Sequence, residues 1–472
     1  MIGSLVSTLL KLKELSVQVY FTVLLFLFSF LPSNTSADSS ETYFSVNPVQ
    51  IENTLISSLP TNAKWSFSAL SLGSGSQTIN AGNAKALPLV PGSLMKLFIV
   101  AAVLDMDSKE KIQMNTIVAC DGLIFEGKLR GSLYLKGSGN AFLSERDMES
   151  AAEEIFSRGI KEITGNIIAD DSLFDIKGWN SYYQGPAYVS PGSLGLDLHT
   201  INVFGRPPNI KVEPPNDDVK VSFVPDRKPG IRQIDDLTYE IRGEISESGI
   251  FKKRFALQDP ATYAALTFKT LLREKGINLK GTVRRGETPP HATEIFRIKA
   301  KDLREIIKDT NNNSLNVVAE NLLLLIGAKR FGSPGTVQKG IKAVYEFISE
   351  IDLLPSEVSL ADGSGLSPDN RITSEQLVIF LKKVSETRWF NAFWESLPRV
   401  GIDGTLKKAG YVNEHIRAKS GQLNGVYCLA GYIEREDKSL IAFSYMVNVP
   451  GADLFAKDTI GFLLATLAGK GS

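Results

Sequence analysis

The sequence predicts an α/β (α+β) fold in which one helix-and-sheet domain is interrupted by a large, mainly β insertion. Residues 38–108 combine helical and strand patterns, residues 109–297 are dominated by short β-like runs between turns, and residues 298–472 return to helices followed by strands. At 472 residues the chain is also too long for one ordinary core. The pattern leaves open whether the insertion forms one subdomain or two.

Residues 1–37 have the pattern of a secretory signal peptide. Lys11 and Lys13 precede an apolar run from Val19 to Leu31, and small residues follow at positions 35–37. The run is shorter than the roughly 20 apolar residues of a membrane-spanning helix. We therefore expect a periplasmic or otherwise extracytoplasmic protein, with an uncleaved anchor and peripheral membrane association as the alternative.

The first part of the split domain begins with a predicted helix over residues 45–58. Residues 64–72 alternate as a strand, and residues 77–81 return beside it. Pro91-Gly92 then interrupts the chain before residues 93–104, which are apolar on nearly every face. A helix without a polar face is expected to be buried.

The insertion contains β-like runs at residues 131–136 and 163–169 and a Pro-rich β region over about 206–260. A helix is predicted over residues 261–275, where Gly276 suits the C-cap.

The last part of the chain contains predicted helices followed by predicted strands. The helices span residues 302–309, 314–330, 336–350 and 374–384, the strands span 416–421, 426–435 and 440–449, and a final helix spans 458–467.

Composition excludes several classes of protein. Lys plus Arg and Asp plus Glu are both 52, so the zero formal net charge gives no reason to expect a nucleic-acid partner. The two cysteines, Cys120 and Cys428, form no CxxC pair and are expected to be buried small residues. The histidines His199, His291 and His415 are scattered. We therefore expect no metal site, no cofactor and a catalytic base other than histidine.

Ser93-Leu-Met-Lys96 is the first candidate for chemistry. At a spacing of three residues on a helix, the serine and lysine side chains share a face. Serine becomes a nucleophile when a base takes its proton, and lysine can be that base only when burial lowers its pKa. The apolar residues 97–100 would supply such burial. Taken alone, such a pair is more often solvated helix surface than an active site.

Ser314-Leu315-Asn316 is the second candidate. A serine after a run of asparagines that opens an apolar helix is ordinary N-cap chemistry, and alone that interpretation is favoured. In the functional interpretation, Ser314 relays protons and Asn316 binds an amide of the substrate.

Lys419-Ser420-Gly421-Gln422 is the third candidate and falls in a predicted strand. The lysine and the hydroxyl suit a substrate carboxylate, and Gly421 permits a close backbone approach. The N–H of Gln422 could complete an oxyanion hole with the N–H of Ser93. The alternative is an exposed strand end with a turn glycine.

The three patterns in this order are the signature of penicillin-recognising serine enzymes, and the chain resembles that superfamily. Because the first and second motifs are far apart, the chain is most similar to the D-alanyl-D-alanine carboxypeptidases/endopeptidases of peptidase family S13, the class C low-molecular-mass penicillin-binding proteins. The resemblance implies a serine β-lactamase/DD-peptidase-like split domain, in which helices cover an antiparallel sheet.

Other segments share this resemblance, which covers nearly all of the chain after the signal. They are residues 129–139, 165–175, 178–180, 362–367, 401–406 and 417–421. The chain departs from the family pattern at Leu315, where Asp or Asn is usual, and at Ser420, which keeps the hydroxyl of the commoner Thr. Asn140-Ala141 replaces the usual Asp-Pro. None of these changes removes a catalytic group.

The resemblance implies that Ser93 attacks the carbonyl of a D-alanyl peptide bond and that Lys96 takes its proton. It further implies that Ser314 and Lys419 return a proton to the leaving D-Ala. Its implied partners are peptidoglycan stem peptides ending in D-Ala-D-Ala, with β-lactams as covalent inhibitors of Ser93.

Two alternatives stay open at this point. One is a β-lactamase or esterase of the same superfamily, which the large insertion disfavours. The other is a non-catalytic wall-binding scaffold, which the complete set of motif residues disfavours. The balance between carboxypeptidase and endopeptidase activity is not predicted.

Overall fold

The computed structural model describes residues 48–73, 77–177, 189–206, 209–227, 230–235, 238–244, 251–408 and 413–452, together with residues 460, 461, 464 and 467. The chain divides into two units, residues 1–43 and 44–472, and everything described belongs to the second. The predicted signal peptide, the segment 178–180 and most of the predicted helix 458–467 lie outside the described residues.

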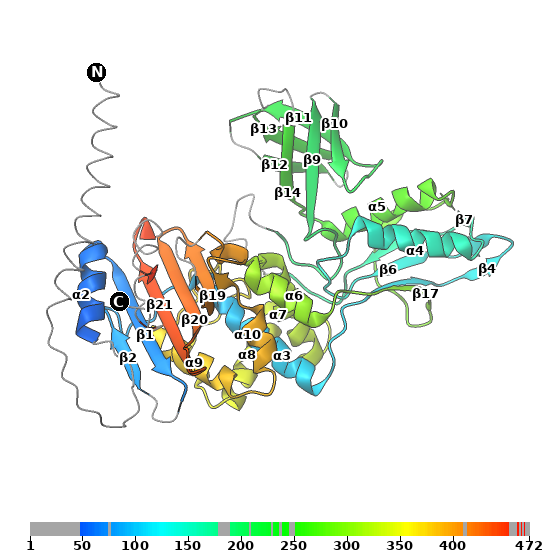
Figure 1. Ribbon diagram of the computed structural model, residues 1–472. Coiled ribbons are helices and arrows are strands. Elements are labelled where there is room, and N and C mark those ends of the chain that lie inside the picture. Colours follow the sequence, from blue (N-terminus) through cyan, green and yellow to red (C-terminus); the bar gives the residue numbers. More distant parts are fainter. Residues whose placement is uncertain are drawn as a thin grey trace, which may run out of the picture. The chain divides into compact units, whose positions relative to one another are not determined.

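A six-stranded antiparallel sheet is built from the two ends of this unit (Figure 1). Its strand order is β18-β19-β20-β21-β1-β2. The strands are β1 Lys64–Ser71, β2 Thr78–Ala81, β18 Arg399–Val400, β19 Asn413–Leu423, β20 Val426–Glu434 and β21 Leu440–Asn448. Because β21 pairs with β1, the predicted split domain with an antiparallel sheet is confirmed.

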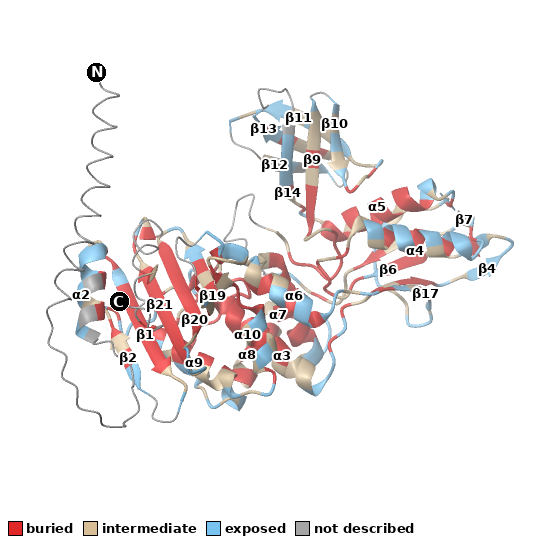
Figure 2. Cartoon of the chain, in the orientation of Figure 1, coloured by how far each residue is buried: buried red, intermediate tan, exposed pale blue. Residues whose placement is uncertain are grey.

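Helices cover both faces of this sheet. On one face lies α2 Pro48–Ser58, whose Leu55 is fully buried. The other face packs on the larger core, to which the remaining helices of the split domain contribute. These are α3 Lys96–Lys109, α6 Leu303–Asn312, α7 Asn316–Phe331, α8 Val337–Glu350, α9 Ser374–Ser385 and α10 Phe390–Ser396. Alternate residues of β20 and β21 enter the two cores, so Figure 2 shows these strands largely buried.

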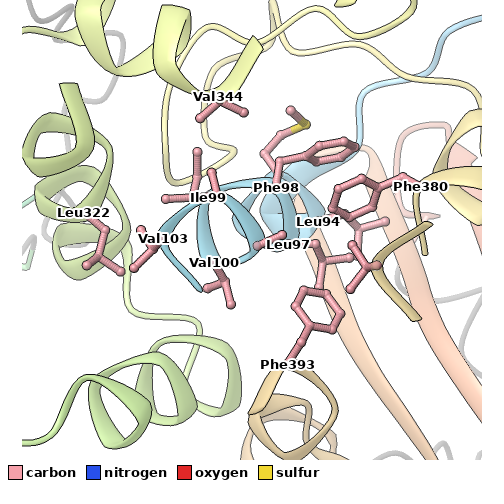
Figure 3. Packing of buried hydrophobic residues seen from close by; sticks show 14 of the residues in the cluster. Leu94, Leu97, Phe98, Ile99, Val100, Val103, Leu322, Val344, Phe380 and Phe393 are labelled. Carbon is pink, nitrogen blue, oxygen red and sulfur yellow. The ribbon is translucent and has the colours of Figure 1, made fainter. Parts of the chain in front are cut away.

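The helix α3 runs through the centre of the larger core (Figure 3). Each residue from Lys96 to Leu104 is at most 4% exposed, which confirms the prediction of a helix buried on every face. The rings of Phe98 and Phe380 stack with centroids 3.9 Å apart. Close packing of this kind makes the start of α3 a rigid base for the side chains placed there.

Residues between the two halves form four smaller sheets, and no described strand among them pairs with the six-stranded sheet. Two sheets have the orders β16-β8-β6-β3-β17 and β15-β7-β5-β4, and the helices α4 Glu145–Ser157 and α5 Pro260–Glu274 belong to the same core. Their strands are β3 Thr116–Cys120, β4 Leu123–Phe125, β5 Lys128–Arg130, β6 Leu133–Lys136, β7 Glu162–Ile163, β8 Ile167–Asp170, β15 Asn278–Leu279, β16 Val283–Arg285 and β17 Thr293–Ile298.

The other two sheets, β10-β9-β14 and β11-β13-β12, have a separate small core. Their strands are β9 Thr200–Arg206, β10 Asn209–Glu213, β11 Lys220–Pro225, β12 Gly230–Asp235, β13 Thr238–Gly243 and β14 Phe251–Ala256.

Two helices were not predicted. In α4, Ser144 and Asp147 form a capping box, a signal present in the sequence but masked by the β-like runs around it. The short α10 begins at Phe390 without a side-chain cap and is formed by packing, with the Phe393 side chain fully buried. Gly276 follows α5 with φ of 84°, as the predicted C-cap requires.

Candidate active site

The Ser93 hydroxyl lies at the start of the buried α3 segment. The predicted helix does not begin as an α-helix, because Gly92–Met95 form one 3₁₀ turn (η1) and α3 starts at Lys96. With three residues per turn, a 3₁₀ turn places side chains i and i+3 directly in line. Lys96 Nζ accordingly lies 2.9 Å from Ser93 Oγ. Ser93 is 8% exposed and Lys96 is fully buried.

Two further oxygen atoms surround the Lys96 amine. Its Nζ donates to Asn316 Oδ1 at 2.8 Å and to the Ser364 carbonyl at 2.5 Å. A neutral amine has two N–H donors and one lone pair. With both donors directed at Asn316 and Ser364, the lone pair can accept the proton of Ser93.

Burial lowers the pKa of Lys96 to about 8, against the opposing effect of the negative charges of Asp362 and Glu320. The amine can therefore be neutral near physiological pH.

Ser314 lies between α6 and α7, in a conformation that the capping interpretation did not predict. Its φ is 54°, in the left-handed region, and the N-cap of α7 is Leu315, without a side-chain cap. The N-cap interpretation of Ser314 is therefore wrong, and α7 begins two residues later than predicted. Left-handed backbone is costly for a non-glycine residue and is often found at functional sites. Here it accompanies a Ser314 Oγ that accepts a hydrogen bond from Lys419 Nζ at 2.9 Å.

Lys419 reaches Ser314 from β19. Its Nζ also donates to the Ser420 carbonyl at 2.8 Å, and the side chain is fully buried. Burial, and then the neighbouring Lys96, hold the pKa of Lys419 well below its usual range. The site thus brings two buried lysines together.

Gly421 lets β19 pass directly against the turn that carries Ser93. A Cβ on Gly421 would lie 2.2 Å from the Pro91 carbonyl oxygen and 3.2 Å from Ser93 N. A Cβ on Gly92, where φ is 55°, would lie 3.3 Å from Gln422 N. The two amides expected in an oxyanion hole, those of Ser93 and Gln422, therefore belong to segments in contact.

The Ser420 hydroxyl, also from the third motif, faces a second hydroxyl. Its Oγ lies 3.2 Å from Thr405 Oγ1. All the predicted site residues from the three motifs thus converge on one place, although they come from η1, α3, the start of α7 and β19.

Sequence reasoning missed three groups around Lys96. The Ser364 carbonyl contacts the amine directly, and Glu320 and Asp362 lie buried behind it. A signal for Glu320 was available, since it is the one charged residue within the apolar run 317–326. A backbone carbonyl such as that of Ser364 has no sequence signal.

Comparisons with known proteins identify the family. The family model of the D-Ala-D-Ala carboxypeptidase 3 (S13) family matches residues 54–466. A D-alanyl-D-alanine carboxypeptidase DacB from Haemophilus influenzae is 25% identical over 397 residues, which cover 76% of this chain and 80% of that protein. A D-alanyl-D-alanine carboxypeptidase from Actinomadura sp. strain R39 is 27% identical over 425 residues, which cover 81% of this chain and 78% of that protein.

Solved structures show the same fold. The crystal structure of penicillin binding protein 4 (dacB) from Haemophilus influenzae matches with a TM-score of 0.74 at 22% identity, covering 89% of this chain and 99% of that one. The same protein complexed with a β-lactam matches with a TM-score of 0.73 at 22% identity and covers 90% of this chain and 98% of that one. Since the family model spans most of the sequence, the chain belongs to the D-Ala-D-Ala carboxypeptidase 3 (S13) family and is a serine-type D-Ala-D-Ala carboxypeptidase.

Proposed function

We propose that this protein cleaves the terminal D-Ala from peptidoglycan stem peptides, and D-alanyl crosslinks between them, through an acyl-enzyme on Ser93. The observation that carries the proposal is the Lys96 amine, which lies 2.9 Å from Ser93 Oγ with its two remaining contacts directed at acceptors. Such a lysine can accept a proton from Ser93 without moving.

Acylation starts when neutral Lys96 takes the Ser93 proton and Ser93 Oγ attacks the carbonyl carbon of the D-Ala-D-Ala bond. The negative charge that develops on the carbonyl oxygen is stabilised by the N–H groups of Ser93 and Gln422. Asn316 uses its carbonyl oxygen for Lys96, so its amide NH₂ is available to a carbonyl on the acyl side of the substrate.

The leaving group departs on the side of the second lysine. The C–N bond breaks as the amine of D-Ala receives, through Ser314, the proton that Lys96 took from Ser93, while Lys419 keeps its own proton and donates a hydrogen bond to Ser314 Oγ. The carboxylate of D-Ala is bound by Lys419 and by the hydroxyl of Ser420, close to the backbone at Gly421. Water then hydrolyses the ester on Ser93, and β-lactams acylate the same oxygen.

A digest of purified muropeptides tests this function. Wild-type protein should release D-Ala from pentapeptide monomers and split crosslinked dimers, and labelled penicillin should bind covalently at Ser93. Ser93→Ala should lose all three activities, whereas Ser150→Ala, which removes an exposed hydroxyl on α4, should retain them. Release of D-Ala by Ser93→Ala would refute the scheme.

We also propose that residues 1–37 direct export and that the enzyme works on the outer side of the cytoplasmic membrane, with peripheral membrane association where that segment is retained. Among the described residues, no helix is long and apolar enough to cross a bilayer. Cell fractionation with N-terminal sequencing tests both statements: a mature chain beginning near residue 38 in the extracytoplasmic fraction supports export with cleavage.

The domain boundaries that we propose are residues 38–108 and 298–472 for the split domain and 109–297 for the insertion. The order of the strands supports them, because the six-stranded sheet takes its strands from Lys64–Ala81 and from Arg399–Asn448. Limited proteolysis should cut first in the exposed connections beside these boundaries, near residues 110–111 and 299–302, rather than within α3 or β17.

A further inference from the structure

Two buried carboxylates, Glu320 and Asp362, lie behind the Lys96 amine. Glu320 is 2% exposed and Asp362 is 6% exposed. Glu320 follows Asn316 by four residues on α7, so the two side chains share one face of that helix. One face of α7 therefore carries both the amide that contacts Lys96 and a carboxylate one turn further along.

Glu320 holds the backbone that in turn holds Lys96. Its Oε1 accepts from Ser364 N at 2.8 Å and its Oε2 accepts from Gly363 N at 3.1 Å. These bonds fix the peptide units that end at Gly363 N and Ser364 N, directly before the unit whose Ser364 carbonyl accepts from Lys96 Nζ.

Asp362 holds the other end of the same loop, residues 362–367. It accepts from Gly365 N at 2.7 Å and from Ser367 N at 2.6 Å. The loop also braces the turn of the nucleophile, since a Cβ on Gly365 would lie 2.0 Å from the Gly92 carbonyl oxygen and 3.0 Å from Ser93 Cα. A shift of the loop 362–367 would therefore also shift Ser93 and the carbonyl that contacts Lys96.

We propose that Glu320 is a positioning residue for the Ser93 reaction, which acts through the loop 362–367 to place the Ser364 carbonyl and, by its charge, biases Lys96 toward keeping its proton. The inference rests on the proposed role of Lys96 as the base. Nothing in it requires Glu320 to touch the substrate.

Among the residues that the structure describes, three charged groups face Lys96, each from a different element. They are Glu320 from α7, Asp362 from the loop and Lys419 from β19. Burial lowers the pKa of Lys96, and the two carboxylates raise it. Burial, and then the charge of Asp362, raise the pKa of Glu320 itself to about 7. Removing the charge of Glu320 should therefore make Lys96 easier to deprotonate.

A purely structural carboxylate offers a matched control. Asp170, 2% exposed at the end of β8, also accepts two backbone hydrogen bonds, from Thr288 N at 2.7 Å and Ser172 N at 3.1 Å. It belongs to the insertion and has no contact with Lys96. Asp170→Asn thus reproduces the loss of a buried charge without the proposed effect.

The experiment is a pH profile of Ser93 acylation, measured by stopped flow with a fluorescent penicillin on the full-length protein, with thermal unfolding to verify folding. In Glu320→Gln the maximal rate should fall about tenfold as one backbone N–H loses its acceptor. The pH at which the rate reaches half of its maximum should fall by roughly half to one pH unit, because a negative charge beside Lys96 is gone. Asp170→Asn should change neither quantity.

Glu320→Asp separates charge from reach. In this variant the rate should rise at the same pH as in wild type, since the charge is retained. The maximal rate should be lower, since the shorter side chain reaches the loop less well. A Glu320→Gln variant whose rise stays at the wild-type pH overturns the inference.

If Glu320→Gln does not fold, a Glu320→Asp profile identical to wild type in rate overturns the inference instead. Absence of Ser93 acylation in wild type would instead contradict the proposed function.

Discussion

The two lysines of the site are equally buried but have different charged groups around them. Lys96 and Lys419 are both fully buried, and each places its Nζ 2.9 Å from a serine hydroxyl. Burial lowers the pKa of Lys96 to about 8, and the carboxylates of Asp362 and Glu320 partly oppose this effect. For Lys419, burial lowers the pKa, and the only further contribution from the described residues is the repulsion of Lys96, which lowers it as well.

The difference shows how one residue type can perform two tasks. A buried lysine whose charged form is partly stabilised by nearby carboxylates can exchange a proton near neutral pH, which a base must do. A buried lysine without a counter-charge gains most when an anion arrives, because the anion favours its charged form. Lys96 is therefore suited to proton transfer, and Lys419 is suited to binding a carboxylate.

The largest effect is expected from Lys96→Met. Loss of the base should reduce Ser93 acylation by about 10²- to 10⁴-fold, measured with labelled penicillin under single-turnover conditions. As a control, Lys85→Met removes an exposed lysine paired with Glu52 and should leave the rate unchanged. Equal rates for Lys96→Met and wild type would show that Lys96 is not the base, so the two lysines would not differ in the way described.

The next effect is expected from Lys419→Ala. Loss of a charged contact with the carboxylate of the substrate should reduce kcat/KM by about 10- to 100-fold for a peptide ending in D-Ala-D-Ala. The same peptide with an amidated C-terminus should lose far less, so the preference for the free acid should nearly vanish. Equal losses on both peptides would show that Lys419 does not read the carboxylate.

The pH dependence should follow Lys96. Because neutral lysine is the base and its pKa is about 8, only about one tenth of the enzyme is competent at pH 7. The value of kcat/KM should therefore rise up to about tenfold between pH 7 and 9 and then level off. A rate that falls with pH across this range would contradict a neutral Lys96.

The smallest effect is expected at Ser420. Its hydroxyl, 3.2 Å from Thr405 Oγ1, contributes one partly exposed hydrogen bond. Ser420→Ala should reduce kcat/KM by about 2- to 10-fold, and Ser420→Thr, which keeps the hydroxyl, should stay close to wild type. A Ser420→Ala loss as large as that of Lys419→Ala would require a catalytic step at Ser420.

Much of the fold followed from local pattern. The burial of α3 was predictable because its residues are apolar on every face, and β19, β20 and β21 were predictable from their β-rich runs. The α4 helix was missed although its capping box was readable. The α10 helix was missed because packing of residues such as Phe393, rather than a cap, stabilises it.

The sequence by itself determined the identities and order of the three motifs, and hence the candidate nucleophile and the two lysines. It could not determine the conformation of Ser314, because the folded protein replaces its N-cap preference with a left-handed backbone, and in that conformation its Oγ accepts a hydrogen bond from Lys419, which lies on a distant strand. Nor could it reveal the Ser364 carbonyl, since every residue has one and only the fold selects which approaches Lys96. Tertiary structure alone decided the difference between the lysines, because a pKa depends on burial and on charges brought together from distant parts of the chain.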